Sequence, residues 1–594
     1  MSKSKNKIFS DLSISNKVSR NGFDLSFTNK FTAKVGELLP LMHRDVMFGD
    51  KWKISLDSFS RTRPVVSPAY TRINEYFDFF FVPYRVLGKN IPHVITQDTS
   101  NPTIASSSIS VQKVGTKVPY TFLGWLRGFT SPGVQPNLNG KYNPLGFDRG
   151  PLSNKLLNHL GYCYVSTDDY SDEKVPSELF AISPEVSLLP LAAYQKIYYD
   201  FYRNTQWEES VPYNYNFDYM GNLAQYEIPA STIQTYWNNH TMFDMCYANY
   251  PKDLFFGLLP DNQLGDTAVV DVDVWSQSTY QFPVRDGDGI EVSFEPTSVV
   301  DVFGMQNSVD PGQGLAGNPN VDIGEFARNL KGQFDILEWR KSNFVQKYRE
   351  IMGTGRKDYK SIVQKIFNVN IPDILTDMCI YLGGHSQTIS ISEVENTNLA
   401  DGNEANLRGK GVGNGKSSLI DFEAKEPGII MCIYHAMPEI DYSLNAFHFD
   451  VVKTEVDDFA NPVFDKLGLQ EFPTYFLDNT PGRHIEDNMY LGFTNRYFDY
   501  KTSVDVVLGD FRESLDMQSW VAPISPDYLL QFAIGGEESD TLVVTSEFFK
   551  VNPRLLDKIF DINSSAHPNT DQLRVKTSFD IQVVRNLDYL GQYF

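Results

Sequence analysis

The chain has 594 residues, of which 41% are hydrophobic and 21% are charged, so it is long enough to bury at least one sizeable core. Its formal net charge of −22 excludes a protein whose whole surface grips nucleic acid, because such surfaces are basic. Its four cysteines are widely spaced and form no CxxC pair, which argues against a disulfide framework or a zinc site and predicts reduced thiols in a cytoplasmic setting; they are Cys163, Cys246, Cys379 and Cys432.

The first 20 residues are basic in an otherwise acidic chain. Their only acidic residue is Asp11, and their basic residues are Lys3, Lys5, Lys7, Lys17 and Arg20. Two interpretations stay open: a solvated, disordered terminus, and a basic arm that contacts phosphates. The N-terminus also lacks the apolar run of a signal peptide, and no apolar stretch elsewhere reaches the roughly 20 residues of a membrane-spanning helix. We therefore expect a soluble protein that is not exported by the usual route.

The stretch from Thr71 to Leu87, TRINEYFDFFFVPYRVL, predicts a central strand of a β-sandwich. Successive side chains of a strand point to opposite faces. One face here is almost wholly apolar and aromatic, and it carries Ile73, Glu75, Phe77, Phe79 and Phe81. Pro83 is expected to end the ladder because it has no N–H to donate.

Two regions between this strand and residue 260 differ in character. Residues 88–150 are rich in Pro, Ser, Asn and Gly without periodicity, which predicts loops that pack against neighbouring subunits rather than a compact domain. Residues 188–207 are the best helix candidate, because their apolar side chains recur at helical spacing. That stripe predicts a core contact rather than a cofactor site, and it consists of Leu191, Tyr194, Ile197, Tyr198 and Phe201.

The middle of the chain changes from acidic to basic. Residues 261–330 hold twelve acidic residues against Arg285 and Arg328, and they predict an exposed, solvated insertion on an outer surface. No calcium-binding loop pattern occurs there. Residues 331–366 are basic and helical, with one apolar face expected from Trp339, Phe344, Tyr348 and Ile351. We favour a surface helix that neutralises the acidic insertion, and the alternative is a helix that faces phosphates.

The remainder of the chain returns to strand patterns separated by turn residues. The predicted strands cover residues 385–394, 426–437, 447–454, 500–511, 540–549 and 575–587. Strands early and late in the chain, with helices inserted between them, predict an all-β sandwich with long insertions.

A search for catalytic motifs yields none. The glycine-rich run 409–418 is not a phosphate-binding loop, because a Walker A motif needs glycine where Lys410 stands and a hydrophobic strand before it. No HExxH or GxSxG motif occurs. His385 is expected to be structural, and His43, His435 and His448 are expected to be satisfied core or interface residues. We therefore predict no enzyme, no catalytic residue, no cofactor and no metal site.

Ten segments, in order along nearly the whole chain, resemble the major capsid proteins of the Microviridae, in the gokushovirus-like or related Bacteroidetes-phage branch. They are FDLS with its flanks, GELLPL at 36–41, GDKWKI at 49–54, FFFVPYRVL at 79–87, and residues 192–207, 250–266, 348–369, 381–397, 464–473 and 500–521. The stretch from about 267 to 330 matches least, where the family is expected to carry a variable, outward-facing insertion.

The resemblance implies a viral eight-stranded antiparallel jelly roll, a β-sandwich with long loop and helical insertions. Copies would form a homo-oligomeric T=1 icosahedral shell around circular single-stranded DNA, assembled in the host bacterial cytoplasm and found in the virion. The implied organisation is an internal arm at 1–20, a first part of the jelly roll at 21–260, the outward insertion at 261–330, and a helical insertion followed by the remaining strands at 331–594.

The acidic charge adds a constraint on partners. A subunit of charge −22 cannot neutralise a genome alone, so the basic arm is the first candidate for DNA contact. A small basic DNA-packaging protein, or polyamines and metal ions, would do the rest. The resemblance also implies a scaffolding protein, a DNA pilot protein and a host surface receptor, without membrane insertion. The alternative function is a secreted carbohydrate-binding or carbohydrate-cleaving β-sandwich protein, which would explain the Tyr, Trp and Asn richness.

Overall fold

The computed structural model describes most of the chain outside its N-terminus and several loops. The described residues are 20–89, 91–96, 102–105, 108–111, 118–122, 149–162, 184–219, 242–266, 268, 273–275, 284–285, 291–292, 331–333, 336–395, 407–443, 449–478, 490–513, 517–525, 528–529, 533–535, 542–560, 562 and 570–588. They separate into two compact units, one made of 1–262 with 355–594 and the other of 263–354.

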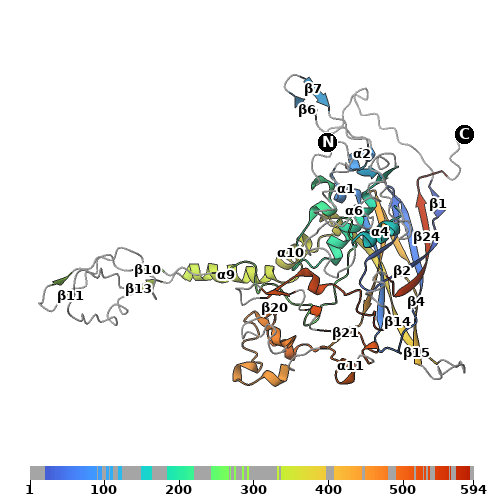
Figure 1. Ribbon diagram of the computed structural model, residues 1–594. Coiled ribbons are helices and arrows are strands. Elements are labelled where there is room, and N and C mark those ends of the chain that lie inside the picture. The colour runs from blue at the N-terminus through green and yellow to red at the C-terminus, as the bar shows by residue number, and fades with distance from the viewer. Residues whose placement is uncertain are drawn as a thin grey trace, which may run out of the picture. The chain divides into compact units, whose positions relative to one another are not determined.

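The larger unit is built on one antiparallel sheet of ten strands (Figure 1). Its strands are β1 (Asn21–Asp24), β2 (Phe27–Ala33), β3 (Leu39–Val46), β4 (Lys51–Thr62), β5 (Ile73–Pro83), β14 (Ile380–Glu395), β15 (Leu407–Lys416), β16 (Ile420–Glu423), β17 (Gly428–Pro438) and β24 (Leu573–Arg585). Eight of them follow one another in the order β1-β24-β4-β15-β14-β5-β17-β3, while β2 also pairs with β24 and β16 with β4. The first and last strands of the chain are therefore neighbours.

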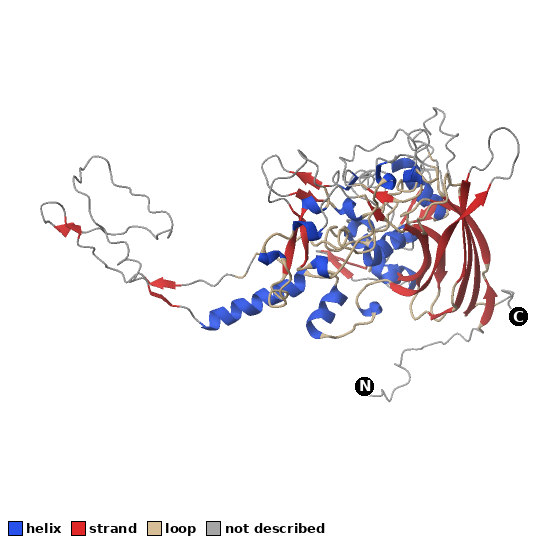
Figure 2. Cartoon of the chain, turned by 90° about the horizontal axis from the view of Figure 1, so that it is seen from below, coloured by secondary structure: helices blue, strands red, loops and turns tan. Residues whose placement is uncertain are grey.

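Strand β14 joins the two halves of this sheet. Its first part, Ile380–Ile389, pairs with β5, and its second part, Ser390–Glu395, pairs with β15. The sheet is strongly curved, as the red ribbons in Figure 2 show, and its two halves contribute to one common core. The predicted all-β jelly-roll sandwich is confirmed.

Aromatic side chains fill the space between the two halves. Phe79 of β5 meets Phe579 of β24 edge to face, with ring centroids 6.3 Å apart. The ring centroids of Phe81 on β5 and Phe422 on β16 lie 4.9 Å apart. Those of Phe31 on β2 and Tyr434 on β17 lie 5.0 Å apart. The prediction of a central strand ending at Pro83 is confirmed, because β5 lies between β14 and β17 and its phenylalanines are fully buried.

A buried polar cluster sits among these aromatic residues. The Glu75 carboxylate, which is fully buried, accepts hydrogen bonds from Ser60 Oγ at 2.8 Å, from Gln387 Nε2 at 2.6 Å and from the Tyr434 hydroxyl at 2.6 Å. These four residues lie on β5, β4, β14 and β17, so the cluster spans both halves of the sandwich. Burial raises the pKa of Glu75, and the three hydrogen bonds oppose that shift.

Residues 409–416 of the glycine-rich run belong to β15 and pack beside this cluster. A Cβ atom on Gly411 would lie 2.5 Å from Thr62 Cγ2, and one on Gly413 would lie 3.0 Å from Ile389 Cγ1. The glycines therefore let β15 approach its neighbours closely. Their role is in packing, in agreement with the exclusion of a phosphate loop.

The predicted helix at 188–207 begins where expected and ends early. Helix α6 (Leu189–Ile197) continues as a π-helical turn through Tyr202, and Arg203 is already extended. The predicted core stripe is confirmed for four buried residues, while Phe201 is half-buried. The other helices are α1 (Tyr84–Leu87), α2 (Ile91–Thr96), α4 (Arg149–His159), α9 (Ile336–Gly353), α10 (Tyr359–Phe367) and α11 (Asp510–Glu513). None of the described helices is long and apolar enough to cross a membrane.

Short strand pairs complete the secondary structure. They are β6 (Pro102–Ala105) with β7 (Ser108–Val111), β8 (Tyr120–Phe122) with β9 (Glu185–Ser187), β10 (Asp273–Trp275) with β13 (Lys331–Gln333), β11 (Val284–Arg285) with β12 (Glu291–Val292), β18 (Asp441–Tyr442) with β21 (Pro523–Ile524), β19 (Leu469–Pro473) with β20 (Tyr490–Asn495), and β22 (Ala533–Gly535) with β23 (Leu542–Val544). Much of the loop region 88–150 and most of the acidic insertion lie outside the described residues.

Two predicted strands are wrong. Residues 449–452 form a 3₁₀ turn, and within 500–511 only Val506 makes a bridge, to Tyr442. The segment 540–549 is a strand only at β23 and then forms a 3₁₀ turn. The valines of these segments predict strands, but a strand forms only where a neighbouring strand supplies hydrogen bonds.

The helical prediction for 331–366 is confirmed from Ile336 onward by α9 and α10, which belong to different units. It is wrong for residues 331–333, which form strand β13. The expected apolar face of α9 is exposed at each of its four positions, Trp339, Phe344, Tyr348 and Ile351.

Candidate functional site

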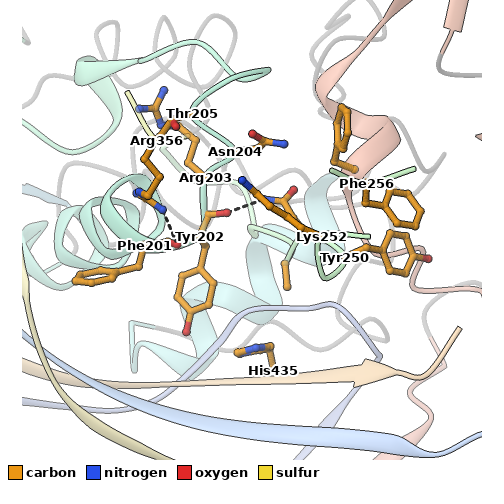
Figure 3. Close-up of a pocket in the computed structure, with 13 residues that line it drawn as sticks. Phe201, Tyr202, Arg203, Asn204, Thr205, Tyr250, Lys252, Phe256, Arg356 and His435 are labelled. Carbon is orange, nitrogen blue, oxygen red and sulfur yellow. Dashed lines mark hydrogen bonds between the residues drawn. The ribbon is translucent and has the colours of Figure 1, made fainter. Parts of the chain in front are cut away.

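A cavity of about 240 Å³ lies beside the end of the π-helical turn in the larger unit (Figure 3). Its walls come from residues 201–205, from the segment Ala248–Phe256, and from Arg356, while His435 of β17 lies at its floor. Three cationic side chains line it: Arg203, Lys252 and Arg356. We call it the basic pocket.

Arg356 fixes the shape of the pocket by capping the π-helical turn. Its guanidinium donates to the carbonyl oxygens of Asp200 and Phe201, which have no partner further along the helix, and its Nε donates to Asp358 at 3.0 Å. Asn249 Nδ2 donates to the Tyr202 carbonyl at 2.6 Å, so the opposite wall is tied to the same turn. The pocket is therefore held by hydrogen bonds before any ligand arrives.

Positive charge is concentrated next to the pocket. Lys365 Nζ donates to the Arg356 carbonyl at 2.9 Å. The pKa of Lys365 is lowered chiefly by burial and further by the neighbouring charges of Lys252 and Lys357, while Asp358 opposes the shift. An anion placed here would relieve that repulsion.

The floor of the pocket is uncharged near neutral pH. Burial lowers the pKa of His435 to about 4, and its ring stacks on Tyr76 with centroids 4.8 Å apart. The residues lining the pocket include no carboxylate. This chemistry suits the binding of an anion rather than proton transfer between an acid and a base.

Two exposed surfaces with large apolar side chains also lie on the larger unit. The first, which we call the helix surface, comprises α10 and the residues that flank it, Lys357, Val369 and Leu375; Tyr359 and Phe367 are 65% and 68% exposed there. The second, which we call the loop surface, covers residues 454–467, where Val456 and Val463 are 88% and 78% exposed. Apolar side chains this exposed are typical of surfaces that another protein covers.

The predicted DNA contact of the basic arm stays a prediction. Of the predicted basic arm, Arg20 is described, and Lys3, Lys5, Lys7 and Lys17 lie outside the described residues. Arg20 is exposed at the start of β1, where its Nε donates to Asn586 Oδ1 at 3.1 Å, and it does not line the basic pocket.

The prediction of a satisfied histidine is confirmed for His43, which is half-buried and bonded to the Leu160 carbonyl at 2.9 Å. His435 is largely buried on β17, as predicted, but its Nδ1 has no hydrogen-bond partner among the described residues, so the expectation that it is satisfied is wrong. His448 lies outside the described residues. The sequence did not predict that Arg203, Lys252 and Arg356 line one pocket, because they come from three separate segments. Only the basic stretch around Arg356 carried a sequence signal.

Comparison with known proteins gives a consistent result. The family described as Capsid protein (F protein) matches residues 13–120 and 164–592. Capsid protein VP1 of Bdellovibrio phage phiMH2K is 22% identical over 525 residues, covering 84% of this chain and 84% of that protein. Capsid protein VP1 of Chlamydia phage 1 is 21% identical over 561 residues, covering 85% and 86%.

The family match covers both ends of the sandwich, from β1 to β24, together with the segments that form the basic pocket and the two exposed surfaces. The carbohydrate-active alternative is not favoured by any of these matches. The chain belongs to the F family of phage capsid proteins and is a structural major capsid protein of the Microviridae type.

Proposed function

We propose that copies of this chain assemble into a small T=1 icosahedral shell that encloses circular single-stranded DNA, with a structural rather than a catalytic role. The observation that carries the proposal is the family match along almost the whole sandwich. The exposed apolar surfaces support it, because a shell subunit must bury them against its neighbours. Electron microscopy of the purified full chain is expected to show small isometric particles, and a persistent monomer under all conditions would contradict the proposal.

The N-terminal arm is proposed to lie inside the shell and contact the genome. Lys3, Lys5, Lys7 and Lys17 together would neutralise about four phosphates per subunit. Deleting residues 1–19, which leaves the Arg20–Asn586 hydrogen bond in place, is expected to lower the DNA content per particle while shells still form. The ratio of nucleic-acid absorbance to protein absorbance in purified particles measures the DNA content. A matched control replaces the four lysines with serine at constant length, and unchanged DNA content in both variants would refute the role of the arm.

The acidic insertion at 261–330 is proposed to project outward and to serve host attachment, supported by its composition of twelve acidic residues against two basic ones. Limited proteolysis of intact particles is expected to cut first within 267–330 and to leave the sandwich whole. Mass spectrometry of the fragments locates the cuts. If that region stays intact while other parts are cut, the outward placement fails.

Further partners are proposed from the charge and from the family. A subunit charge of −22 requires added cations around the genome, which a small basic packaging protein, polyamines or metal ions would supply. A scaffolding protein, a DNA pilot protein and a host receptor would complete the set, with assembly in the bacterial cytoplasm. Mass spectrometry of purified virions is expected to find the small basic protein, and virions containing neither it nor bound cations would exclude this scheme.

A further inference from the structure

The loop surface is ordered although it is almost wholly exposed. Every residue whose burial is described between Thr454 and Leu467 is exposed. The Asp458 carboxylate accepts from the backbone N–H groups of Thr454 and Glu455, both at 2.8 Å, and Lys453 anchors the start of the loop by an ion pair with Asp499 at 2.5 Å. A loop fixed in this way presents its apolar side chains at low entropic cost to a partner.

The helix surface is built on an amphipathic helix that the described residues of the chain leave uncovered. Its apolar residues follow the helical spacing i, i+3, i+4, i+7, i+8, at Tyr359, Ile362, Val363, Ile366 and Phe367. The helix is well capped, because the Asp358 carboxylate accepts from Ser361 N at 3.1 Å and Asn368 is left-handed with φ 53°. Yet none of its residues is buried.

A cavity of about 410 Å³ is lined in part by Lys360 of α10 and by residues 370–374, which come just after this helix in the sequence. Its apolar walls come from Phe81, Ile371, Ile374, Ile380 and Phe422, and charged side chains surround them: Lys360, Asp373, Glu423, Lys425 and Glu426. It is large enough to receive an aromatic or branched side chain from outside. This cavity and the stripe of α10 favour an apolar protein partner over a nucleic-acid strand, because a phosphate backbone would leave the apolar side chains in water.

The charges of the two surfaces are opposite. Across residues 454–467 the loop surface carries four acidic residues and one basic one: Glu455, Asp457, Asp458 and Asp465 against Lys466. Asp465 also pairs with Lys501 of the same chain at 2.5 Å. The helix segment 356–366 carries four basic residues and one acidic one: Arg356, Lys357, Lys360 and Lys365 against Asp358. Lys252, Lys357 and Lys365 lie close together, and Asp358 offsets part of their charge. Lys360 pairs with Asp373 at 2.5 Å, so this surface keeps an excess of positive charge that complements the loop surface. Both surfaces are exposed in one chain, so neither covers the other within it.

We propose that the loop surface of one copy of the chain docks on the helix surface of the next copy, with its acidic residues facing the lysines beside the basic pocket. The inference rests on the proposed self-assembly and names the surfaces that carry out part of it. Because the two surfaces differ, the contact is heterologous, and repeating it around a rotation axis closes a ring. Val456, Phe459 and Val463 supply the apolar side chains that cover α10 and enter the cavity that follows it.

A charge exchange in the full chain tests the pairing. Lys357→Glu with Lys365→Glu on the helix surface, and Glu455→Lys with Asp465→Lys on the loop surface, are each expected to lower particle yield about tenfold or more, since like charges then face each other. Combining all four substitutions restores opposite charges and is expected to return the yield to near that of the unmodified chain. Circular dichroism of each variant checks that it is folded.

Substitutions of the exposed valines of the loop surface test the same contact independently of charge. Val456→Ser with Val463→Ser is expected to abolish assembly without loss of stability, because both side chains are exposed in the single chain. Val584→Ser, an exposed position on β24, is the matched control and is expected to assemble normally.

Four outcomes would overturn the pairing. The first is unchanged assembly in the single-surface variants. The second is failure of the combined variant although it is folded. The third is an equal loss in the Val584→Ser control. The fourth is a lower DNA content in equally abundant particles of the helix-surface variant, which would assign the lysines to nucleic acid.

Sedimentation of the unmodified chain separates the proposed shell from the proposed contact. Rings without closed shells would contradict the shell while supporting the contact, and a monomer would contradict both.

Discussion

Replacing Glu75 with alanine is expected to lower the free energy of unfolding by about 3–5 kcal/mol, because it opens a cavity and leaves buried donors unsatisfied. The Ser60 and Tyr434 hydroxyls, both fully buried, lose their acceptor, and the Gln387 amide keeps only its hydrogen bond to Ser60 Oγ at 3.1 Å. These donors come from three strands, so the loss loosens the contact between the halves of the sandwich. Denaturant titration of the unassembled subunit, followed by circular dichroism, measures the difference.

The cost of this substitution is expected to depend on pH in a defined direction. Burial raises the pKa of Glu75 above its ordinary value of 4.5 in the folded state. Its contribution to stability is therefore complete below about pH 4.5 and is lost as the pH rises through the folded pKa. Alanine does not titrate, so the stability difference between the two proteins should be larger at about pH 4.5 than at neutral pH.

The matched control for Glu75 is Glu423 on β16. Its carboxylate is 57% exposed and forms a 3.5 Å ion pair with Lys51 at the surface. Glu423→Ala is expected to change the free energy of unfolding by less than about 1 kcal/mol, since exposed ion pairs contribute little. A loss below about 1 kcal/mol for Glu75→Ala as well would show that the buried cluster is energetically unimportant.

Replacing Phe79 with alanine is expected to destabilise the subunit by about 3–5 kcal/mol, the range for large aromatic truncations in a packed core. Phe79 is fully buried and meets Phe579 across the sandwich. Its strand is held on both sides by β14 and β17, which limits how far the backbone can move to fill the cavity. The same denaturant titration at neutral pH measures the effect.

Phe48 supplies the control for Phe79. It is 53% exposed, so Phe48→Ala is expected to change stability by only about 0.5 kcal/mol. If both phenylalanines gave similarly small effects, β5 would not be the centre of the core. A change in the slope of the titration would point instead to an altered unfolded state.

Several elements were predictable from the sequence because their signals are local. The alternation of aromatic residues predicted β5, the helical spacing predicted α6, and the polar–apolar alternation at 575–587 predicted β24. Each pattern depends on side chains within a few residues of one another. The order of ten segments along the chain was sufficient to identify the family, and the jelly-roll fold was then predicted from the family.

Only the tertiary structure could decide the rest. The segments 447–454 and 500–511 have the residues of strands, but in their described parts Phe449–Val452 forms a 3₁₀ turn and only Val506 makes a bridge, to Tyr442. Glu75 sits on an apolar face, and only the meeting of β4, β14 and β17 supplies its three donors. The basic pocket joins Arg203, Lys252 and Arg356 from segments that are far apart in the chain. A sequence pattern determines which face of an element is apolar, whereas the packing of distant elements determines which polar groups meet.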